Sequence, residues 1–508
     1  MIHSIACMLV AVSTIEVRSD APPPSSEVTA TLQVVDDESM PLPCRVHLRG
    51  PDGKPVQPAG LPFWKDHFCF GGSVELRLSP GCYAYEIERG PEYESITGEW
   101  EIAAGEHAEL TVTLRQLADL AQLGWYSADL HVHRPVSDMP LLLAAENLDV
   151  APVITWWNAT NPWTVANRPR STTHQTPDGR FYDVMAGEDE RGGGALLYFG
   201  MAQPLAIAGA ARERPSSLEF LEQAKQLSPE IWVDIEKPFW RDVPLWLASG
   251  KVDSMGIAHN HLWRIGGLDN EAWGRPRDAQ SWPGPQGNGR WTQEIYYRAL
   301  NCGLRIPPSA GSASGVLPNP VGYNRAYVHV DGPLTYPSWW EGLRAGRVFV
   351  TNGPLLLATA DEQLPGHVFR AKRGPLRLSI RGRVVCREPI AGLEVIKDGR
   401  VVEALAGSDQ RNFAFETEID CDRSGWLLIR AIAGDTSTFR FASTGPFYVE
   451  IGDNTRRIDR RSASFFQSWA EERRAELSSL LDARTREEVL PIHDRAIKFW
   501  ADLLRRAE

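Results

Sequence analysis

Asp129-Leu130-His131-Val132-His133 places two histidines two residues apart at the end of a predicted strand. On an extended strand, residues i and i+2 point to the same face, so both imidazoles would lie side by side. Paired imidazoles at a strand end are a common way to hold a transition metal. Asp129 could orient a ligand by accepting its second N–H. The motif predicts a metal site, with a metal-free network of buried hydrogen bonds as the alternative.

The pattern of apolar and polar residues changes along the chain on either side of this motif. Val28, Ala30, Leu32 and Val34 alternate with polar residues, and similar short runs continue to about residue 115. From residue 117, apolar runs such as Val150–Trp157 alternate with helical patterns, which is typical of a buried α/β sheet. Alternation returns near residue 375, and helical patterns follow residue 453.

These hydrophobic patterns predict an α/β fold with flanking β regions. The predicted parts are a possible signal peptide and linker (1–26), an N-terminal β-sandwich (27–116), an α/β domain (117–354), a C-terminal β-sandwich (355–452) and a helical hairpin (453–508). Helices are expected near 217–227 and 338–346. Ser464 with Gln467, and Thr485 with Glu488, match the capping-box pattern and predict where the two terminal helices begin.

The bulk properties limit the classes of function. A chain of 508 residues exceeds what one hydrophobic core usually serves, so about two to four domains are expected. The formal charge of -12 argues against a nucleic acid or an anionic membrane as a partner held by bulk electrostatics. Beyond the N-terminal stretch, no segment is long and apolar enough to predict a transmembrane helix.

The N-terminus and the cysteines bear on the question of whether the protein is exported or cytoplasmic. Met1–Ile15 has the length and hydropathy of a signal-peptide core, although it lacks a preceding Lys or Arg. We therefore expect an exported protein, periplasmic or extracellular, with a cytoplasmic one as the alternative. In an exported chain, Cys386 and Cys421 could form a disulfide; buried free thiols are the alternative.

Residues 127–138 support a family resemblance. The segment Ser127–His133, followed by Ser137-Asp138, resembles the first motif of the PHP (polymerase and histidinol phosphatase) superfamily. The resemblance covers about residues 120–354 and is strongest to the CehA/McbA-like metallohydrolase branch. It implies a distorted β/α barrel that binds divalent metals and hydrolyses phosphoesters or other esters. Gly187-Glu188-Asp189-Glu190 is similar to the family's third motif, which implies that Glu188 is a metal ligand.

Other motifs of the family are altered in this chain. Trp156 and Trp157 stand where the second motif has Asp and His, and indole offers a metal no lone pair. Lys237 replaces the His of the fourth motif. Gly311–Gly315 lacks both ligands of the last motif. The resemblance therefore implies a reduced metal cluster.

A second histidine pair offers a replacement for the missing ligands. His259 and His261 have the same spacing as the first pair and lie where the family has another strand end. The candidate ligand set is then His131, His133, Glu188, His259 and His261. Several His with one carboxylate suit Zn, Mn or Fe, with a position open for water; the number of ions stays undetermined.

Four further residues are candidates for catalysis. Asp138 or Glu236 could take a proton from water. Arg134 and Lys237 could stabilise negative charge on an ester or phosphate oxygen, although a surface ion pair is an equal alternative for Arg134.

The leading hypothesis is a metal-dependent hydrolase acting on ester or phosphoester bonds of a small-molecule or glycan-like substrate. The first alternative is a non-catalytic binding protein, in which the β-sandwiches and the Trp-rich cleft recognise a glycan or cell-envelope component. A structural assembly module built on the terminal helices is a third possibility.

Overall fold

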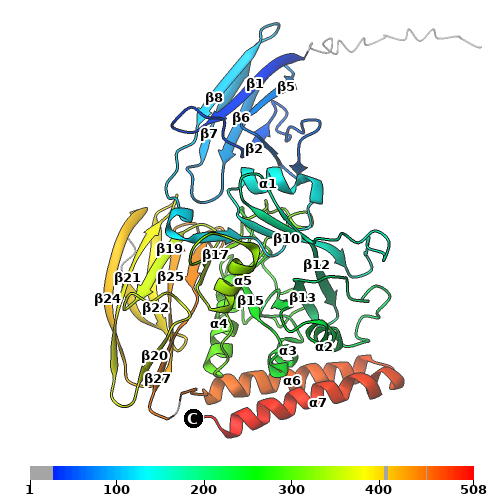
Figure 1. Ribbon diagram of the computed structural model, residues 1–508, viewed down its shortest axis with the longest axis vertical. Coiled ribbons are helices and arrows are strands. Elements are labelled where there is room, and N and C mark those ends of the chain that lie inside the picture. The colour runs from blue at the N-terminus through cyan, green and yellow to red at the C-terminus, as the bar shows by residue number, and fades with distance from the viewer. Residues whose placement is uncertain (1–26, 406–409, 454) are drawn as a thin grey trace, which may run out of the picture.

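The computed structural model describes residues 27–405, 410–453 and 455–508. The predicted signal peptide, residues 1–26, lies outside this range. Two β-sheets form one end of the molecule, an α/β region lies in the middle, a β-rich region lies beside it, and two long helices cross the far end (Figure 1). The protein is therefore a mixed α/β structure with several sheets and a C-terminal helical pair, as the hydrophobic patterns predicted.

The N-terminal region consists of two facing sheets. One has the order β5-β1-β8 and the other β3-β4-β2-β6-β7. Inward-facing residues Val28, Ala30, Leu32 and Val34 are buried in the core between them, which confirms the predicted alternation. The strands are β1 (Val28–Val35), β2 (Cys44–Arg49), β3 (Phe63–Trp64), β4 (His67–Phe70), β5 (Ser73–Leu78), β6 (Gly81–Glu88), β7 (Ile96–Ile102) and β8 (Ala108–Thr113).

The central region is built on one long mixed sheet. Strands such as β10, β13 and β14 are almost wholly buried, which explains their continuous apolar sequences. In this region the strands are β9 (Trp125–Ala128), β10 (Val150–Trp157), β11 (Thr173–Gln175), β12 (Phe181–Arg191), β13 (Gly194–Phe199), β14 (Trp232–Ile235), β15 (Ser254–Ala258), β16 (Pro308–Ala310), β17 (Arg325–His329) and β18 (Val348–Thr351). They follow the order β16-β15-β14-β13-β12-β10-β9-β17-β18, and β11 pairs with β12.

The same sheet continues into the C-terminal β region. β18 pairs with β26, and the order runs on as β26-β25-β22-β23, with β27 and β20 beside β25. A second sheet, β19-β21-β24, shares a hydrophobic core with this extension. The strands are β19 (Leu355–Ala360), β20 (Val368–Ala371), β21 (Leu376–Val385), β22 (Ile390–Lys397), β23 (Arg400–Leu405), β24 (Asn412–Cys421), β25 (Gly425–Ala433), β26 (Phe441–Thr444) and β27 (Phe447–Ile451). The sandwich-like packing was expected; the continuous sheet was not.

Helices cover the central sheet and cross its base. They are α1 (Met139–Ala145), α2 (Ser217–Leu227), α3 (Val243–Ser249), α4 (Gly287–Asn301), α5 (Tyr336–Arg344), α6 (Arg460–Leu480) and α7 (Ala483–Arg505), with 3₁₀ turns η1 (Ala121–Leu123) and η2 (Val136–Asp138). The helices predicted near 217–227 and 338–346 are α2 and α5.

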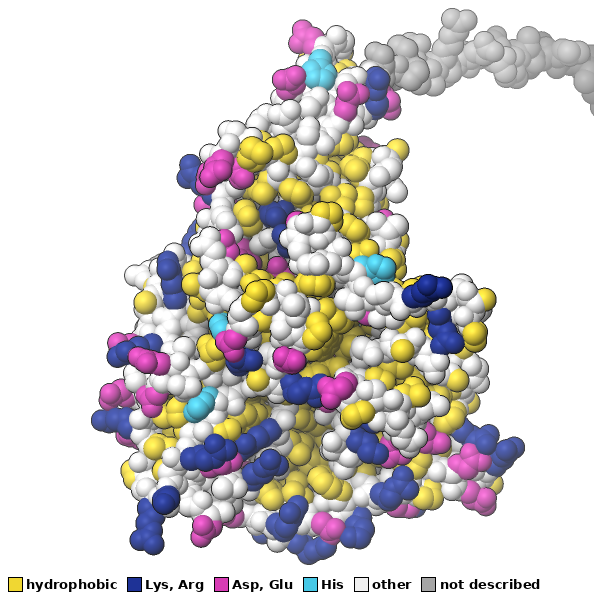
Figure 2. Space-filling view, viewed as in Figure 1, with side chains coloured by type: hydrophobic (Ala, Val, Ile, Leu, Met, Phe, Trp, Pro, Cys, Tyr) yellow, Lys and Arg dark blue, Asp and Glu magenta, His cyan; other side chains and the backbone are white. Residues whose placement is uncertain are grey.

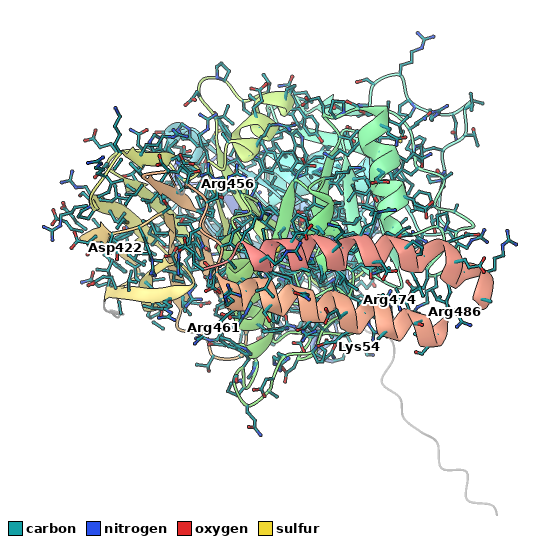
Figure 3. The ribbon with its side chains drawn as sticks, turned by 90° about the horizontal axis from the view of Figure 1, so that it is seen from below. Lys54, Asp422, Arg456, Arg461, Arg474 and Arg486 are labelled. Carbon is teal, nitrogen blue, oxygen red and sulfur yellow. The ribbon has the colours of Figure 1, made fainter. Side chains whose placement is uncertain are left out.

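The terminal helices α6 and α7 run side by side, with Arg474 on one and Arg486 on the other (Figure 3). The predicted capping boxes are wrong. Asp459 and Asp482 are the N-caps, and their carboxylates accept the backbone N–H of Ser462 and Thr485. Aspartate caps a helix as well as serine or threonine does, so the helices begin earlier than the sequence pattern indicated.

A buried ion-pair network holds the terminal helices against the central region. Arg473 of α6 donates to Asp242 and Glu213, and all three side chains are largely buried. The indole of Trp500 donates to the carbonyl of Pro244 at 2.9 Å. These polar contacts fix the position of a helical pair that otherwise packs through apolar side chains.

Acidic and basic side chains are interspersed over one face of the molecule (Figure 2). Within the described residues, the six cysteines are free, and Cys386 and Cys421 are buried thiols rather than a disulfide. None of the helices in the described ranges is long and apolar enough to cross a membrane.

Glu92 links the N-terminal region to the central sheet. Its buried carboxylate accepts the N–H of Leu120 at 2.9 Å and the hydroxyl of Tyr327 at 3.0 Å. Burial raises the pKa of Glu92 to about 7, although these donors act in the opposite direction. The folded protein therefore keeps a proton on Glu92 that the unfolded chain has already lost near neutral pH.

Glu92→Gln should weaken the pH dependence of stability. Because the folded pKa is raised, Glu92 lowers the free energy of unfolding as pH rises from about 4.5 to 7, by about 3 kcal/mol. Chemical denaturation of wild type and variant across this window would measure the difference. Glu101→Gln, at an exposed position on β7, is the control. Identical pH profiles for Glu92→Gln and wild type would contradict the assignment.

Candidate functional site

The histidine motif lies directly after β9, in an extended segment between two neighbours. Val132 bridges to Val153 of β10 on one side and to Ser314 on the other. The N–H of His133 donates to the carbonyl of Ser314 at 2.8 Å, and the N–H of Ile154 donates to the carbonyl of Val132 at 2.8 Å. These contacts keep the segment extended, so His131 and His133 project to the same side.

Asp129 fixes the start of this segment. Its buried carboxylate accepts the backbone N–H of His131 at 3.0 Å, of Ser312 at 3.0 Å and of Gly322 at 2.7 Å. Burial raises the pKa of Asp129, and these donors offset part of the effect. From the sequence we expected Asp129 to accept a ring N–H from a metal ligand. In the structure its carboxylate accepts backbone N–H groups.

The two imidazoles of the motif meet Glu188. The Nε2 atoms of His131 and His133 are 3.1 Å apart. Glu188 Oε2 lies 3.5 Å from the first and 3.2 Å from the second. The three potential ligand atoms all lie within 4.8 Å of one another. The structure thus brings together three of the candidate ligands that the motif and the family resemblance indicated, and they could hold a metal ion.

The carboxylates on either side of His131 favour a positive charge on its imidazole ring. Burial disfavours a charged His131, yet Glu188 and Glu236 outweigh it and raise its pKa to about 10. Burial also acts against a charged Glu188, but His131 and His133 lower its pKa to about 2. Burial lowers the pKa of His133. The group therefore holds one imidazolium between two carboxylates.

Glu236 occupies the far side of His131. Its Oε1 lies 3.3 Å from His131 Nδ1, opposite the nitrogen that faces Glu188. The other oxygen of Glu236 accepts from Lys237 and, at 3.0 Å, from the indole of Trp240. Burial would raise the pKa of Glu236, but Lys237 and His131 hold it well below its usual range. A carboxylate in this place orients the imidazole rather than reaching the ligand atoms.

His259 and His261 are not among the three residues whose potential ligand atoms converge. The Nε2 of His259 bonds to Thr292 Oγ1 at 2.9 Å, and its Nδ1 accepts the N–H of His261 at 3.2 Å. His261 Nδ1 donates to the carbonyl of Asn270 at 3.2 Å. Burial and the nearby charge of Lys237 lower the pKa of both, that of His259 to about 3. Both nitrogens of His259 are thus used inside the protein.

The candidate catalytic residue Arg134 points toward the N-terminal region, and the candidate Asp138 lies beside it. The Arg134 guanidinium is buried, donates to the carbonyl of Phe63 at 3.2 Å and lies over the ring of Trp64. Asp138 lies 3.9 Å from Arg134 and bonds to the hydroxyl of Ser137. Arg134 is therefore part of the contact between two regions, and its ion pair with the partly exposed Asp138 agrees in part with the surface ion pair considered as the alternative.

The two tryptophans that replace family ligands play different parts. Trp156 is fully buried, and its indole donates to the carbonyl of Met185 at 2.9 Å. Its ring lies against Gly187, where a Cβ atom would come within 1.9 Å of it. Trp157 lies beside His133, with ring centroids 4.9 Å apart. Trp156 thus fills the interior, and Trp157 forms a wall of the histidine site.

Glu190 is a further acidic group beside the site. Burial, together with the charge of Glu188, raises its pKa to about 7. The i, i+2 spacing of Glu188 and Glu190 on β12 was the available signal, because it places both side chains on one face of the strand.

A separate cavity of about 620 Å³ lies where the three regions meet. Its lining includes many arginines, and two of them, Arg45 and Arg387, pair with buried carboxylates. Arg45 pairs with Glu88 and Glu146, and Arg387 also pairs with Glu88. The cavity is therefore lined by ion pairs within the protein, at the joint where the three regions meet.

Asp129→Asn should destabilise the fold and disturb the histidine segment. The amide NH₂ would face a backbone N–H that now donates to the carboxylate, which costs about 1–3 kcal/mol. Equilibrium denaturation would measure this loss. Asp37→Asn, at an exposed position, should change stability by less than about 0.5 kcal/mol. Equal stability of the two variants would contradict the anchoring role.

Comparison with known proteins does not assign the chain. It matches no protein-family model and no curated protein. Fibronectin(III)-like modules of CbhA from Clostridium thermocellum align with 18% of this chain and 94% of theirs, at 16% identity and a TM-score of 0.14. The TIE protein of Bacillus anthracis aligns over 84% of this chain and 50% of its own, at 10% identity and a TM-score of 0.15. Similarity this low carries no argument about fold or activity.

Proposed function

We propose that the protein is a metal-dependent hydrolase of ester or phosphoester bonds, with its metal centre at His131, His133 and Glu188. The carrying observation is the convergence of two imidazole nitrogens and one carboxylate oxygen within 4.8 Å. Two histidines and a carboxylate leave coordination positions open, as catalytic zinc sites and related iron sites do.

The residues present fit a divalent cation. Glu188 Oε2 and Glu236 Oε1 are buried and lack a hydrogen-bond partner among the described residues. Glu188 and Glu236 are both held ionised and face the imidazolium of His131, and Lys237 also pairs with Glu236. A bound cation would take the place of the His131 proton and supply a partner for Glu188.

In the proposed centre, the nearby side chains would bind the ion, orient its ligands, exchange a proton or exclude water. A bound divalent ion would polarise the scissile group and make water more acidic. His131, His133 and Glu188 would hold the ion. Glu236 would orient His131 through Nδ1, and Lys237 with Trp240 would keep Glu236 in place. Glu190, whose pKa is raised to about 7, would exchange a proton, and Trp157 would shield one side from water.

The proposal includes a distorted β/α barrel of the PHP type. Adjacent pairings run from β10 through β12, β13, β14 and β15 to β16. The N–H of Leu130 donates to the carbonyl of Ala310 at the end of β16, and Val132 bridges to β10. These contacts support a closed ring of strands in which the histidine segment is the member between β16 and β10. Glu236 and His259 directly follow β14 and β15, where barrel enzymes place their chemistry.

His131→Ala/His133→Ala should lose about one bound transition-metal ion per chain and any metal-dependent hydrolysis, because both imidazole ligands are gone. Elemental analysis of the purified chain, followed by assays with phosphomonoester, phosphodiester and aryl-ester substrates, would measure both. His107→Ala/His174→Ala removes two exposed histidines outside the site and should retain both properties. Unchanged metal content in the first variant would refute the centre; a metal-loaded chain without turnover would instead favour a binding protein.

Glu236→Gln should weaken metal binding while leaving the fold intact. Loss of the carboxylate that faces His131 Nδ1 is expected to lower metal affinity about 10–100-fold. Competition with a chelator would measure the affinity, and thermal denaturation of the metal-free protein would check the fold. Glu222→Gln, on the surface helix α2, is the matched control. Equal affinity in both variants would remove Glu236 from the proposed arrangement.

A further inference from the structure

We propose that the N-terminal region contains a second transition-metal site, formed by His47, Asp66 and His67. His47 lies on β2, Asp66 in the turn between β3 and β4, and His67 at the start of β4. This site is separate from the candidate hydrolase centre and does not depend on it.

The three side chains converge on one point. Asp66 Oδ2 lies 3.2 Å from His47 Nδ1, and Asp66 Oδ1 lies 3.1 Å from His67 Nδ1. The two imidazole centroids are 5.1 Å apart, and the potential ligand atoms all lie within 4.8 Å of one another. A carboxylate between two imidazole nitrogens is a donor set that a single ion can share.

His47 supplies the independent observation that points to a ligand. The residue is only 5% exposed, and neither ring nitrogen makes a hydrogen bond of good geometry among the described residues; Nδ1 only faces Asp66 Oδ2 at 3.2 Å. A buried polar group that is poorly hydrogen-bonded costs free energy, and a bound ion at Nδ1 would remove that cost. Glu88 Oε2 lies 3.8 Å from His47 Nε2 and pairs with Arg45, while Arg387 pairs with the other oxygen of Glu88. That carboxylate is placed to orient the ring from behind, as partners of metal-bound histidines do.

The donor set selects the kind of ion. Two imidazoles and one carboxylate suit Zn²⁺ and related transition metals, whereas Ca²⁺ and Mg²⁺ prefer oxygen ligands alone. The Asp66 side chain is 30% exposed, so the site is open to solvent and to entry of an ion.

The position of the site indicates a structural task. The β3–β4 hairpin touches the central region through Trp64, whose indole donates to the carbonyl of Leu317 at 2.7 Å. Its neighbour Phe63 accepts from Arg134, the residue that follows His133. In Figure 1, β2 lies next to α1, where the N-terminal sheets meet the body. An ion at His47, Asp66 and His67 would tie this hairpin to β2 and so hold the docking contact beside the histidine motif.

Zinc titration of the full chain in a His131→Ala/His133→Ala background isolates the second site. About one Zn²⁺ should bind, and adding Asp66→Asn should weaken binding at least about tenfold because the shared carboxylate is lost. Asp52→Asn, an exposed position in the same region, should leave affinity unchanged. Absence of zinc binding by the folded background protein, or equal affinity of the two aspartate variants, would overturn the proposal.

Hydrogen exchange of the unmutated chain tests the same site without any substitution. Zn²⁺ should slow exchange in residues 63–70, because the ion ties the hairpin to β2. This readout stays interpretable even if a variant fails to fold. Exchange in residues 63–70 that is unchanged by Zn²⁺ would overturn the proposal.

Discussion

The Asp129 carboxylate accepts backbone N–H groups from His131, Ser312 and Gly322, and the geometry of the site depends on this interaction. These donors come from segments far apart in the chain. One buried carboxylate therefore fixes the histidine segment against the loop that follows β16 and against the turn before β17. Removing such an acceptor leaves several buried donors without partners, which is far more costly than the loss of one exposed bond.

Buried charge is organised around this anchor in two separate groups. At the site, Glu188 and Glu236 face opposite nitrogens of His131, and Lys237 compensates one of them. At the joint with the N-terminal region, Arg45 lies between Glu88 and Glu146, with Arg387 beside Glu88. At the joint, arginines pair with Glu88 and Glu146, whereas the site brings two imidazole nitrogens and one carboxylate oxygen within 4.8 Å of one another. This difference is why a cation is proposed at the site and none in the cavity.

Much of the fold was predictable because local patterns agree with their burial. The alternation of β1, the continuous apolar run of β10 and the helical period of α2 all match the structure. Two features were not predictable from local pattern. The sheet of the central region continues through β18 and β26 into the C-terminal region, which only strand pairing decides. The ends of the terminal helices depend on which carboxylate reaches the free N–H groups, and Asp459 and Asp482 do so.

For the site, the sequence by itself determined that His131 and His133 would project together, since two-residue spacing on an extended backbone forces this. The family resemblance added Glu188, and Lys237 and Glu236 were recognised as charged residues at a strand end. Only the tertiary structure decided how these residues meet. It placed Glu236 behind His131, turned Arg134 toward Phe63 and engaged His259 with Thr292. Such roles depend on distances between side chains from different strands, and spacing along one strand contains no information about them.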